Sequence, residues 1–534
     1  MNHDDDFNVD LEGQTTRRDL LKRAGVLGAA LALAPAGAAY GADAGARGLL
    51  LPTQRPKRGG HLRIGLVGGS AKDTADPHLA PFIPDDALNW LMFQGLVEFD
   101  PGFTPKPMLA EEVSSNKTGT VWTVKLKRGI RWHNGKPFTA DDVVYSFRRI
   151  LDPKSPKSGA SALRGLKPSG VTKVDARTVR FRLDVANVIF GTDGLGNRLV
   201  HVVPRGFNPR KPIGTGPWKM TSFRPGDRFV FEGFDDYHGG APYLDKVTLI
   251  EFADPTARLN ALQSGAVDAM IELPPSQINA VKRRGIVPLN ARSGGWIPFR
   301  MRCDQKPFDD VRVRQAFRLI VDRKQVLANA FSNAGWLGND MYSPFDKGYP
   351  KLPQREQDLE QARFLLRQAG YGDGLNVELI TSEAASASAI PMATIFAQQA
   401  KGAGVNVTVK AVDASVIFGA QYLDWNFAVS NWGYRNYLQQ AATTSTADAP
   451  FNETHWQDAT WAALVKQAFA TVDDAKRNAL VRQAERIEYN KGGYIIPNFK
   501  NTLDAYSNKL AGFVKTDVMG IPLGRWRLHK VFFK

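Results

Sequence analysis

The sequence predicts a mixed α/β fold, and three observations support this prediction. Stretches in which apolar and polar residues alternate, as in β-strands, are interspersed with stretches that have the periodicity of helices. The two kinds of stretch follow each other without a fixed repeat length, which excludes a repeat array. With 43% hydrophobic residues in 534, the chain can bury several cores, and at about 150 residues per domain it should form about two to four lobes.

The first half of the chain is expected to contain short strands and two helices. Three ranges alternate apolar and polar side chains and are predicted to be half-buried strands: residues 62–66, 122–126 and 179–183. One helix is predicted from Asp86 to Val97. Another should begin at Thr139, because this capping residue is followed three positions later by the acidic Asp142.

The second half continues this alternation. A helix should begin at Asp254-Pro255 and end at Gly265, since proline favours the first helical turn and glycine the helix end. Further expected elements are a strand at 267–271, a helix at 358–369, strands at 377–380 and 405–409, and between them a helix around Ile395. No long Pro- or Ser-rich linker separates these elements, which favours lobes joined by several short crossings.

The N-terminal residues have the pattern of an export signal. Arg17 and Arg18 precede Asp-Leu-Leu-Lys, an apolar stretch at 24–34 and then small residues through Ala46. The paired arginines resemble a twin-arginine signal, so residues 1–46 are expected to be the signal peptide and its cleavage zone. The alternative is a membrane anchor, but the apolar stretch is shorter than the about 20 residues that span a bilayer. No later apolar run is long enough to span one.

Charge and cysteine content narrow the possible partners. The formal net charge of +16 is compatible with nucleic acid, an anionic membrane surface or anionic ligands. An exported protein rarely meets nucleic acid, so that partner is not expected. The densest basic groups, Lys282-Arg283-Arg284 and Arg312, Arg314 and Arg318, are interpreted as solvent-exposed faces of amphipathic helices. The single cysteine, Cys303, lies far from the cleavage zone, which argues against a lipid anchor.

Motifs for catalysis or metal binding are weak. The eight histidines never approach each other at metal-ligand spacing, so neither a metal site nor a cofactor is expected. Gly214-Thr215-Gly216-Pro217 lacks the Lys-Ser/Thr ending of a P-loop and is interpreted as a structural turn, and His133-Asn134-Gly135 as a hairpin turn. A Gly-x-Ser-x-Gly motif is missing and nothing local supports Cys303 as a nucleophile, so the chain is not expected to be an enzyme.

Several short strings occur in a characteristic order along the chain. They are NWLMFQGLV (89–97), WTVKL (122–126), GIRWHNG (129–135), FTADDV (138–143), GTGPW (214–218), PFDDVRVRQA (307–316) and AGY (369–371). Together they resemble the family 5 extracellular solute-binding proteins, the oligopeptide, dipeptide and nickel receptors of ABC importers. Each string is weak alone, but the resemblance covers nearly all of the chain after about residue 59.

The resemblance implies a type II periplasmic-binding-protein fold with two hinged lobes and an extra subdomain. By analogy, lobe I would comprise residues 47–88, 209–296 and 500–534, the extra subdomain residues 89–208, and lobe II residues 297–499. The lobes would close over a ligand that binds the closed state better than the open one.

The function implied is that of a soluble, monomeric periplasmic receptor. It would capture a peptide-like or small anionic organic solute and hand it to the permease subunits of an ABC importer. Two alternatives stay open on the sequence: a periplasmic chemosensory or chaperone-like binding protein on the same fold, and an exported hydrolase.

The stretch 426–437 departs from the family pattern in an informative way. In peptide-binding relatives this strand ends in Trp-x-x-Asp, whose aspartate holds the α-amino group of the peptide. Here Arg435 stands three positions after Trp432, which reverses the charge. An ammonium group about 4 Å from a guanidinium would be repelled by about 4 kcal/mol at an effective dielectric of about 20, so an anionic or acceptor group is expected there instead. Alternatively, Arg435 turns to solvent or pairs with Asp424.

The remaining candidate contacts are aromatic, amide and hydroxyl side chains. Trp296 and Trp432 are expected to form walls of the cleft, because flat rings bury area at little cost in entropy, whereas Trp425 fits a core equally well. Ser70 and Thr74 follow the first strand, where relatives bring hydroxyls to the ligand, although ordinary loop polarity would also explain them. The predicted ligand-binding set is Arg435, Trp432, Trp296, Tyr434, Asn431, Ser70 and Thr74.

Overall fold

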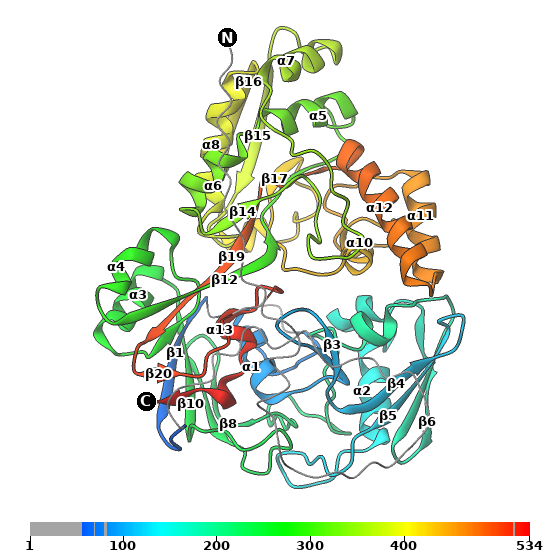
Figure 1. Cartoon of the computed structure of the whole chain (residues 1–534), viewed down its shortest axis with the longest axis vertical. Helices are drawn as coiled ribbons and strands as arrows, with labels where there is room; N and C mark the ends of the chain where they lie inside the picture. The colour runs from blue at the N-terminus through cyan, green and yellow to red at the C-terminus, as the bar shows by residue number, and fades with distance from the viewer. Residues whose placement is uncertain (1–55, 69, 80–82, 516–517) are drawn as a thin grey trace, which may run out of the picture. The chain divides into compact units, whose positions relative to one another are not determined.

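The computed structural model describes residues 56–534, except residues 69, 80–82 and 516–517. The predicted export signal, residues 1–46, lies outside the described part. Helices and strands alternate along the described residues, and their strands form five sheets, which confirms the mixed α/β prediction (Figure 1). No helix among these residues is long and apolar enough to cross a membrane.

The largest sheet is assembled from segments that are far apart in the sequence. Its strands lie in the order β12 (Ile286–Trp296), β19 (Asn498–Ser507), β11 (Ala269–Met270), β1 (His61–Val67), β10 (Lys246–Phe252), β9 (Arg228–Gly233) and β8 (Trp218–Arg224), and β14 (Gly335–Leu337) also pairs with β19. β1 runs parallel to both β10 and β11. Leu62, Ile64 and Leu66 of β1 are fully buried, so the predicted strand at 62–66 is confirmed.

Four short helices lie next to strands of this sheet along the chain: α1 (Ile83–Met92), α3 (Pro255–Ser264), α4 (Ile278–Lys282) and α13 (Pro522–Arg525). The predicted ends of α3 are confirmed, because Asp254 accepts a hydrogen bond from the Ala257 amide at 2.6 Å and Gly265 has a φ of 78°. A left-handed residue at this position ends a helix at least cost when it is glycine.

A second sheet has the strand order β16 (Val405–Ala411), β15 (Leu375–Thr381), β17 (Phe427–Val429), β13 (Phe299–Met301) and β18 (Tyr494–Ile495). β12 leads into β13 and β18 leads into β19, so two backbone crossings join this sheet to the largest one. Its core contains Phe299, Phe317, Phe396 and Phe427. The helices that share this core or lie next to it in sequence are α5 (Val311–Ile320), α6 (Arg323–Phe331), α7 (Leu359–Gln368), α8 (Ala389–Lys401) and α9 (Ala414–Ile417).

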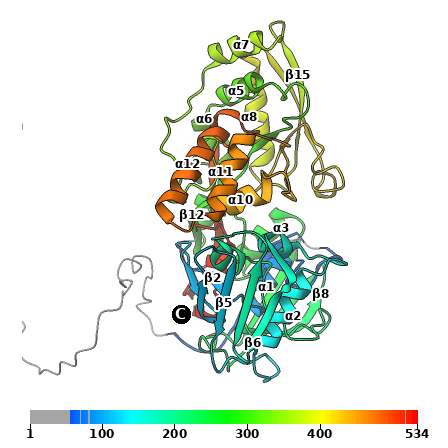
Figure 2. The ribbon, with the colours of Figure 1, turned by 90° about the vertical axis from the view of Figure 1, so that its right-hand side faces the viewer.

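Three further helices surround a separate aromatic core. They are α10 (Tyr437–Thr444), α11 (Ala459–Ala470) and α12 (Asp474–Lys491), which Figure 2 shows side by side. This core includes Trp296, Trp432, Tyr437 and Trp461. The end of β12 and the residues that follow β17 therefore meet in one cluster.

The third sheet lies within residues 110–183 and has the order β4 (Ala110–Ser115), β5 (Val121–Leu126), β7 (Thr178–Leu183) and β6 (Leu166–Asp175). It packs with α2 (Ala140–Ile150) around its own core. Thr139 begins α2 as predicted, with a capping box in which its amide donates to Asp142 Oδ2 at 2.9 Å. Two small sheets pair β2 (Val97–Phe99) with β3 (Pro105–Pro107) and β20 (Leu510–Ala511) with β21 (Phe532–Phe533).

Helix α1 differs from its prediction, because it ends at Met92 rather than at Val97. The Gly216 amide donates to the Met92 carbonyl at 2.8 Å, and a Cβ atom at Gly214 would lie 1.8 Å from the same oxygen. The turn at 214–217 therefore closes the end of α1, which confirms its interpretation as a structural turn. The helix thus ends where it meets residues more than 120 positions away, and the local sequence gives no sign of such a contact.

Arg314 and Arg318 correct the interpretation of the basic groups as exposed. Both side chains are buried, whereas Arg312 and residues 282–284 are exposed as expected. Arg314 Nη2 donates to the Lys491 carbonyl at 2.7 Å, and Arg318 Nη2 donates to the Gly492 carbonyl at 2.5 Å. These carbonyls lie at the end of α12, where backbone oxygens lack helical partners. The polar face of α5 is therefore satisfied by a helix end rather than by water.

The turn that contains α13 has a rare backbone conformation. Leu523, Gly524, Arg525 and Trp526 have φ values of 48°, 64°, 66° and 53°. Each non-glycine residue in this left-handed region costs about 1–2 kcal/mol. Two contacts offset this cost: the Leu523 amide donates to Asp504 Oδ2 at 2.6 Å, and Arg525 donates to the Phe99 carbonyl.

Candidate ligand-binding site

The candidate site is built from the end of β12 and the stretch after β17. Trp296 and Trp432 exchange two backbone hydrogen bonds of 2.9 Å, and their rings stack with centroids 6.4 Å apart. These two predicted residues, separated by more than 130 positions, are thus in direct contact. The pairing fixes the course of the chain from Asn431 to Arg435.

The two tryptophans differ in their surroundings. Trp296 is 1% exposed and packs against Tyr342 and Tyr494, with ring centroids at 5.6 and 5.2 Å. Trp432 is 8% exposed, and the Arg435 guanidinium lies 5.4 Å from its ring centroid. Trp432 is therefore the member of the pair that lies beside the charged group.

A buried carboxylate that sequence reasoning missed holds Trp432 in place. Glu453 is fully buried and accepts hydrogen bonds from Trp432 Nε1 at 3.0 Å, Tyr494 Oη at 2.9 Å and Ser430 Oγ at 2.5 Å, as well as from Tyr422. Arg300 Nε lies 3.9 Å from Glu453 Oε1. In the sequence Glu453 is a single acid in a polar loop, which gave no signal of burial.

Arg435 is half-buried and has no carboxylate partner among the described residues. Its Nη1 donates to the Gly433 carbonyl and to Gln440 Oε1, both at 3.3 Å. Asp424 does not pair with it and instead lies 3.7 Å from Arg302. Burial, and then the neighbouring guanidinium of Arg198, lower the pKa of Arg435 to about 10.

Arg198 is a second cation that the sequence analysis did not select. Its Nη1 lies 2.7 Å from Asp86 Oδ1, near the start of α1. Asp86 thus holds Arg198 near Arg435, although the two guanidiniums repel each other. Two cations held together, one of which lacks a carboxylate partner, favour an anionic group between or beside them.

Tyr434 and Asn431 lie on the same stretch. The buried Tyr434 ring contacts Phe103 and Phe345 with centroid distances of 4.7 and 5.4 Å. A Cβ atom at Gly294 would lie 2.5 Å from this ring, so glycine is required there. The Oδ1 atom of the half-buried Asn431 is itself buried and accepts no hydrogen bond from the described residues.

Burial raises the pKa of Tyr434, and three nearby carboxylates raise it further: Asp346, Asp193 and Glu485. Burial raises the pKa of Asp193 to about 7 and that of Glu485 well above its usual value. Asp346 Oδ2 accepts a hydrogen bond from the Tyr437 amide at 2.8 Å. In the described part of the chain, no group of three or more such side chains is arranged to hold a metal ion.

Ser70 and Thr74 lie after β1 and bond to their own loop. Ser70 Oγ accepts from the Lys72 amide and Thr74 Oγ1 accepts from the Asp76 amide, each at 3.1 Å. The Thr74 amide donates to Asp85 Oδ1 of α1 at 2.6 Å. No hydrogen bond among the described residues joins these two side chains to Trp432 or Arg435.

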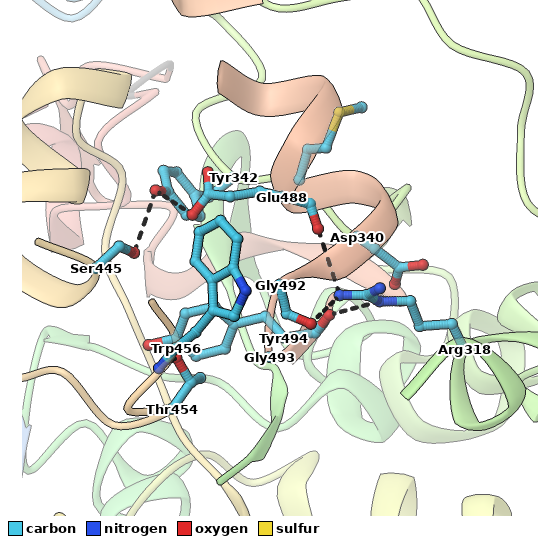
Figure 3. A pocket seen from close by; sticks show the side chains of 11 residues that line it. Arg318, Asp340, Tyr342, Ser445, Thr454, Trp456, Glu488, Gly492, Gly493 and Tyr494 are labelled. Carbon is cyan, nitrogen blue, oxygen red and sulfur yellow. Dashed lines mark hydrogen bonds between the residues drawn. The ribbon is translucent and has the colours of Figure 1, made fainter. Parts of the chain in front are cut away.

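A small cavity is lined by Tyr342 and Tyr494, the two rings that pack against Trp296 (Figure 3). Its volume is about 10 Å³, which is near the minimum for one water molecule. Tyr342 donates to Glu488 Oε1 at 2.9 Å on one side, and Arg318 donates to backbone carbonyls on the other. The cavity is a polar packing gap and is too small for a solute.

The model for bacterial extracellular solute-binding proteins, family 5 (Middle), matches residues 104–452. The chain is a family 5 extracellular solute-binding protein. The resemblance seen in the short strings of the sequence is thereby confirmed, and the family consists of binding proteins rather than enzymes.

Individual family 5 relatives agree over most of the chain. The dipeptide-binding protein of Escherichia coli K12 is 26% identical over 487 residues, covering 84% of this chain and 90% of that protein. The structure of AppA from Bacillus subtilis in complex with a nonapeptide has a TM-score of 0.77 at 22% identity, covering 90% of this chain and 100% of that one. AgaA from A. tumefaciens R10 in complex with agropinic acid has a TM-score of 0.77 at 24% identity, covering 89% and 99%. The type II periplasmic-binding-protein fold is thereby confirmed.

Proposed function

We propose that this family 5 protein is the receptor of an ABC importer for a peptide-like or small organic solute that carries an anionic group. The solute binds between lobe I, residues 47–88, 209–296 and 500–534, and lobe II, residues 297–499. The extra subdomain, residues 89–208, contributes Arg198. Binding closes the lobes, and the closed form delivers the solute to the permease subunits.

Arg435 is the observation that carries this proposal. Its guanidinium is half-buried, lacks a carboxylate partner among the described residues and lies beside a second cation. Leaving a partly buried charge uncompensated costs free energy, which an acidic ligand group would recover through charge-assisted hydrogen bonds. Trp432, 5.4 Å from the guanidinium, offers a flat surface to the ligand next to that group, with Tyr434 and Asn431 on the same stretch.

The relatives support both parts of the proposed ligand class. One structural relative holds a nonapeptide and another holds agropinic acid, which is an acid by name. A carboxylate at Arg435 is compatible with a peptide only if the peptide does not place its amino group there. Trp296 and the hydroxyls of Ser70 and Thr74 complete the proposed contacts.

The proposed site of action is the periplasm. The paired arginines and apolar stretch of residues 1–46 support export by a twin-arginine route followed by cleavage, and the family is extracellular by description. The protein would act as a soluble monomer and without turnover of its ligand. Conversion of any bound solute by the pure protein would contradict the receptor assignment.

The test is a ligand screen by thermal shift followed by calorimetry on the full chain. The screen contains peptides, opines, sugars and organic acids. A ligand at about 100 times its Kd should stabilise the protein by about 2.7 kcal/mol. For an acidic ligand, we expect Arg435→Asp to weaken binding about 100-fold or more, because repulsion replaces an ion pair.

Two variants serve as controls. Arg283→Asp makes the same change of charge at an exposed residue after α4 and should leave Kd within about twofold. Arg435→Gln removes the charge without reversing it and should give an intermediate loss. If Arg435→Asp binds the ligand as tightly as the Arg283→Asp control, the proposed anion site is wrong.

A further inference from the structure

A second cavity, of about 350 Å³, shares no lining residue with the candidate site. Its volume falls within the range of about 300–1,000 Å³ that is usual for small-molecule pockets. His238 and Gly239 at its edge are exposed, so it is open to solvent. It is lined by Trp90, Gln94, Glu98, Met108, Lys127, Pro217, Tyr237, His238, Gly239, Arg525, Trp526, Arg527 and His529.

The charged groups of this cavity are mostly cationic. Lys127, Arg525 and Arg527 face a single acid, Glu98. Within the described residues, the Arg527 side chain makes neither a hydrogen bond nor an ion pair. A half-buried guanidinium that lines a cavity and lacks a hydrogen-bond partner favours an anionic ligand.

The neutral polar groups add further hydrogen-bond donors. Gln94 Nε2 donates a hydrogen bond to Tyr237 Oη at 2.9 Å, so the hydroxyl proton of Tyr237 needs a different acceptor. The described residues do not supply one. Gln94 Oε1 accepts from Thr215 and from His238 Nε2, at 3.1 and 2.8 Å, and is therefore already satisfied. The Trp90 indole N–H is also buried without a partner among the described residues. Buried donors without acceptors are rare in folded proteins and call for an acceptor.

At neutral pH, Glu98 repels a bound anion less strongly than an exposed acid would. Burial raises the pKa of Glu98 to about 7, although Arg527, Arg525 and Lys127 each lower it. An incoming carboxylate would raise it further, and a protonated Glu98 would then donate a hydrogen bond. His529 is neutral at this pH, because burial lowers its pKa to about 3.

The walls of the cavity are aromatic and are shaped by an unusual turn. Arg525, Trp526 and Arg527 are consecutive, and all three line the cavity. The left-handed conformation of residues 523–526 presents neighbouring residues to the same space, which a regular helix or strand does not do. Strained backbone of this kind is concentrated at ligand sites. Trp90 and Trp526 supply flat apolar surface next to the cations.

We infer that this cavity binds a small carboxylate that has a flat apolar body, at a site separate from the solute site of Arg435. The carboxylate is held by Arg527 and by the Tyr237 hydroxyl. The apolar body lies against Trp90 and Trp526. The inference does not depend on the proposed import function, because it concerns different residues.

The test uses calorimetry on the full chain with three matched probes. Indole-3-acetate carries a carboxylate, indole-3-acetamide is neutral and tryptamine is cationic. We expect indole-3-acetate to bind about tenfold more tightly than the amide, and tryptamine not to bind. Equal binding of acetate and amide, preferential binding of tryptamine, or no binding of indole-3-acetate at millimolar concentration would each overturn the inference.

Four substitutions locate the site. Arg527→Ala and Tyr237→Phe should each weaken binding of indole-3-acetate about fivefold or more. Glu98→Gln should preserve or strengthen binding, because Glu98 is the one acid among the described residues that line the cavity. Arg435→Asp should leave the affinity unchanged, since Arg435 does not line the cavity. Loss of binding in Arg435→Asp but not in Arg527→Ala would show that the probe occupies the solute site instead and would refute the second site.

Discussion

At the scale of single residues, Glu453 shows how one carboxylate can organise several aromatic side chains. It receives hydrogen bonds from two tyrosines, a tryptophan and a serine, and Arg300, fully buried as well, lies 3.9 Å away. Ionised carboxylates accept hydrogen bonds only, so they suit a position surrounded by donors. The orientation of Trp432, and through it the setting of Arg435, therefore depends on a residue outside the predicted ligand set.

Replacement of Glu453 by glutamine tests this dependence. The amide NH₂ of glutamine would face the hydrogen-bond donors that now bind the carboxylate, and Arg300 would lose its counter-charge. Glu453→Gln should therefore lower the free energy of unfolding by about 3 kcal/mol or more. Urea unfolding followed by tryptophan fluorescence measures the change. The control is Glu378→Gln, at a half-exposed acid 3.8 Å from Lys410, where we expect about 0.5 kcal/mol or less. Equal effects of the two substitutions would contradict the role given to Glu453.

At the scale of elements, the end of α12 is held by two arginines of α5. The last carbonyls of a helix lack internal partners, and here Arg314 and Arg318 donate to Lys491, Gly492 and Tyr494. The pKa of Arg318 is lowered to about 9, chiefly by burial. Positive charge is also favourable at the negative end of the helix dipole. The contact ties the helices around Trp296 and Trp432 to the second sheet.

The substitution Arg318→Met should therefore destabilise the fold. Methionine keeps much of the aliphatic volume but leaves buried carbonyls without donors, so we expect a loss of about 3 kcal/mol in the free energy of unfolding. Hydrogen exchange should show faster exchange near the end of α12. Arg312→Met, at the exposed arginine of the same helix, is the matched control and should cost less than about 1 kcal/mol. Similar losses would argue against the capping role.

At the scale of the whole molecule, residues 89–208 and residues 297–499 are in direct contact. The Val188 amide donates to the Phe469 carbonyl at 3.0 Å, and the Arg164 guanidinium lies 4.9 Å from the Phe469 ring centroid. The ring centroids of Phe103 and Tyr434 lie 4.7 Å apart. A binding protein gains affinity when contacts of this kind favour the closed state before the ligand arrives.

Phe469→Ala should shift the unliganded protein towards an open form. Small-angle scattering should then report a larger radius of gyration without ligand and a normal one at saturation. The apparent Kd of the solute should rise by about tenfold, which corresponds to about 1.4 kcal/mol spent on closure. Phe364→Ala, at a ring 45% exposed on α7, should change neither quantity. An unchanged radius and Kd in Phe469→Ala would show that these contacts do not control closure.

The sequence by itself determined the local elements, the family and the position of the reversed charge. The capping box of α2 joins residues three positions apart, and the buried face of β1 follows from simple alternation, so both were visible without a structure. The string that contains Trp432 and Arg435 gave the candidate ligand contact, although its role as a ligand contact stays a prediction. Short-range interactions, and motifs shared with relatives, can be recognised directly from the order of residues in the sequence.

Only the tertiary structure decided which polar side chains are buried and which residues lie together. Arg318 was expected in water, but its partners lie at the end of a helix more than 170 positions away. Glu453, Arg198 and the cavity lined by Trp90 and Arg527 gave no local signal for the same reason. A charged side chain on an amphipathic helix looks the same whether water or a distant backbone carbonyl satisfies it, and the choice is made when the segments pack.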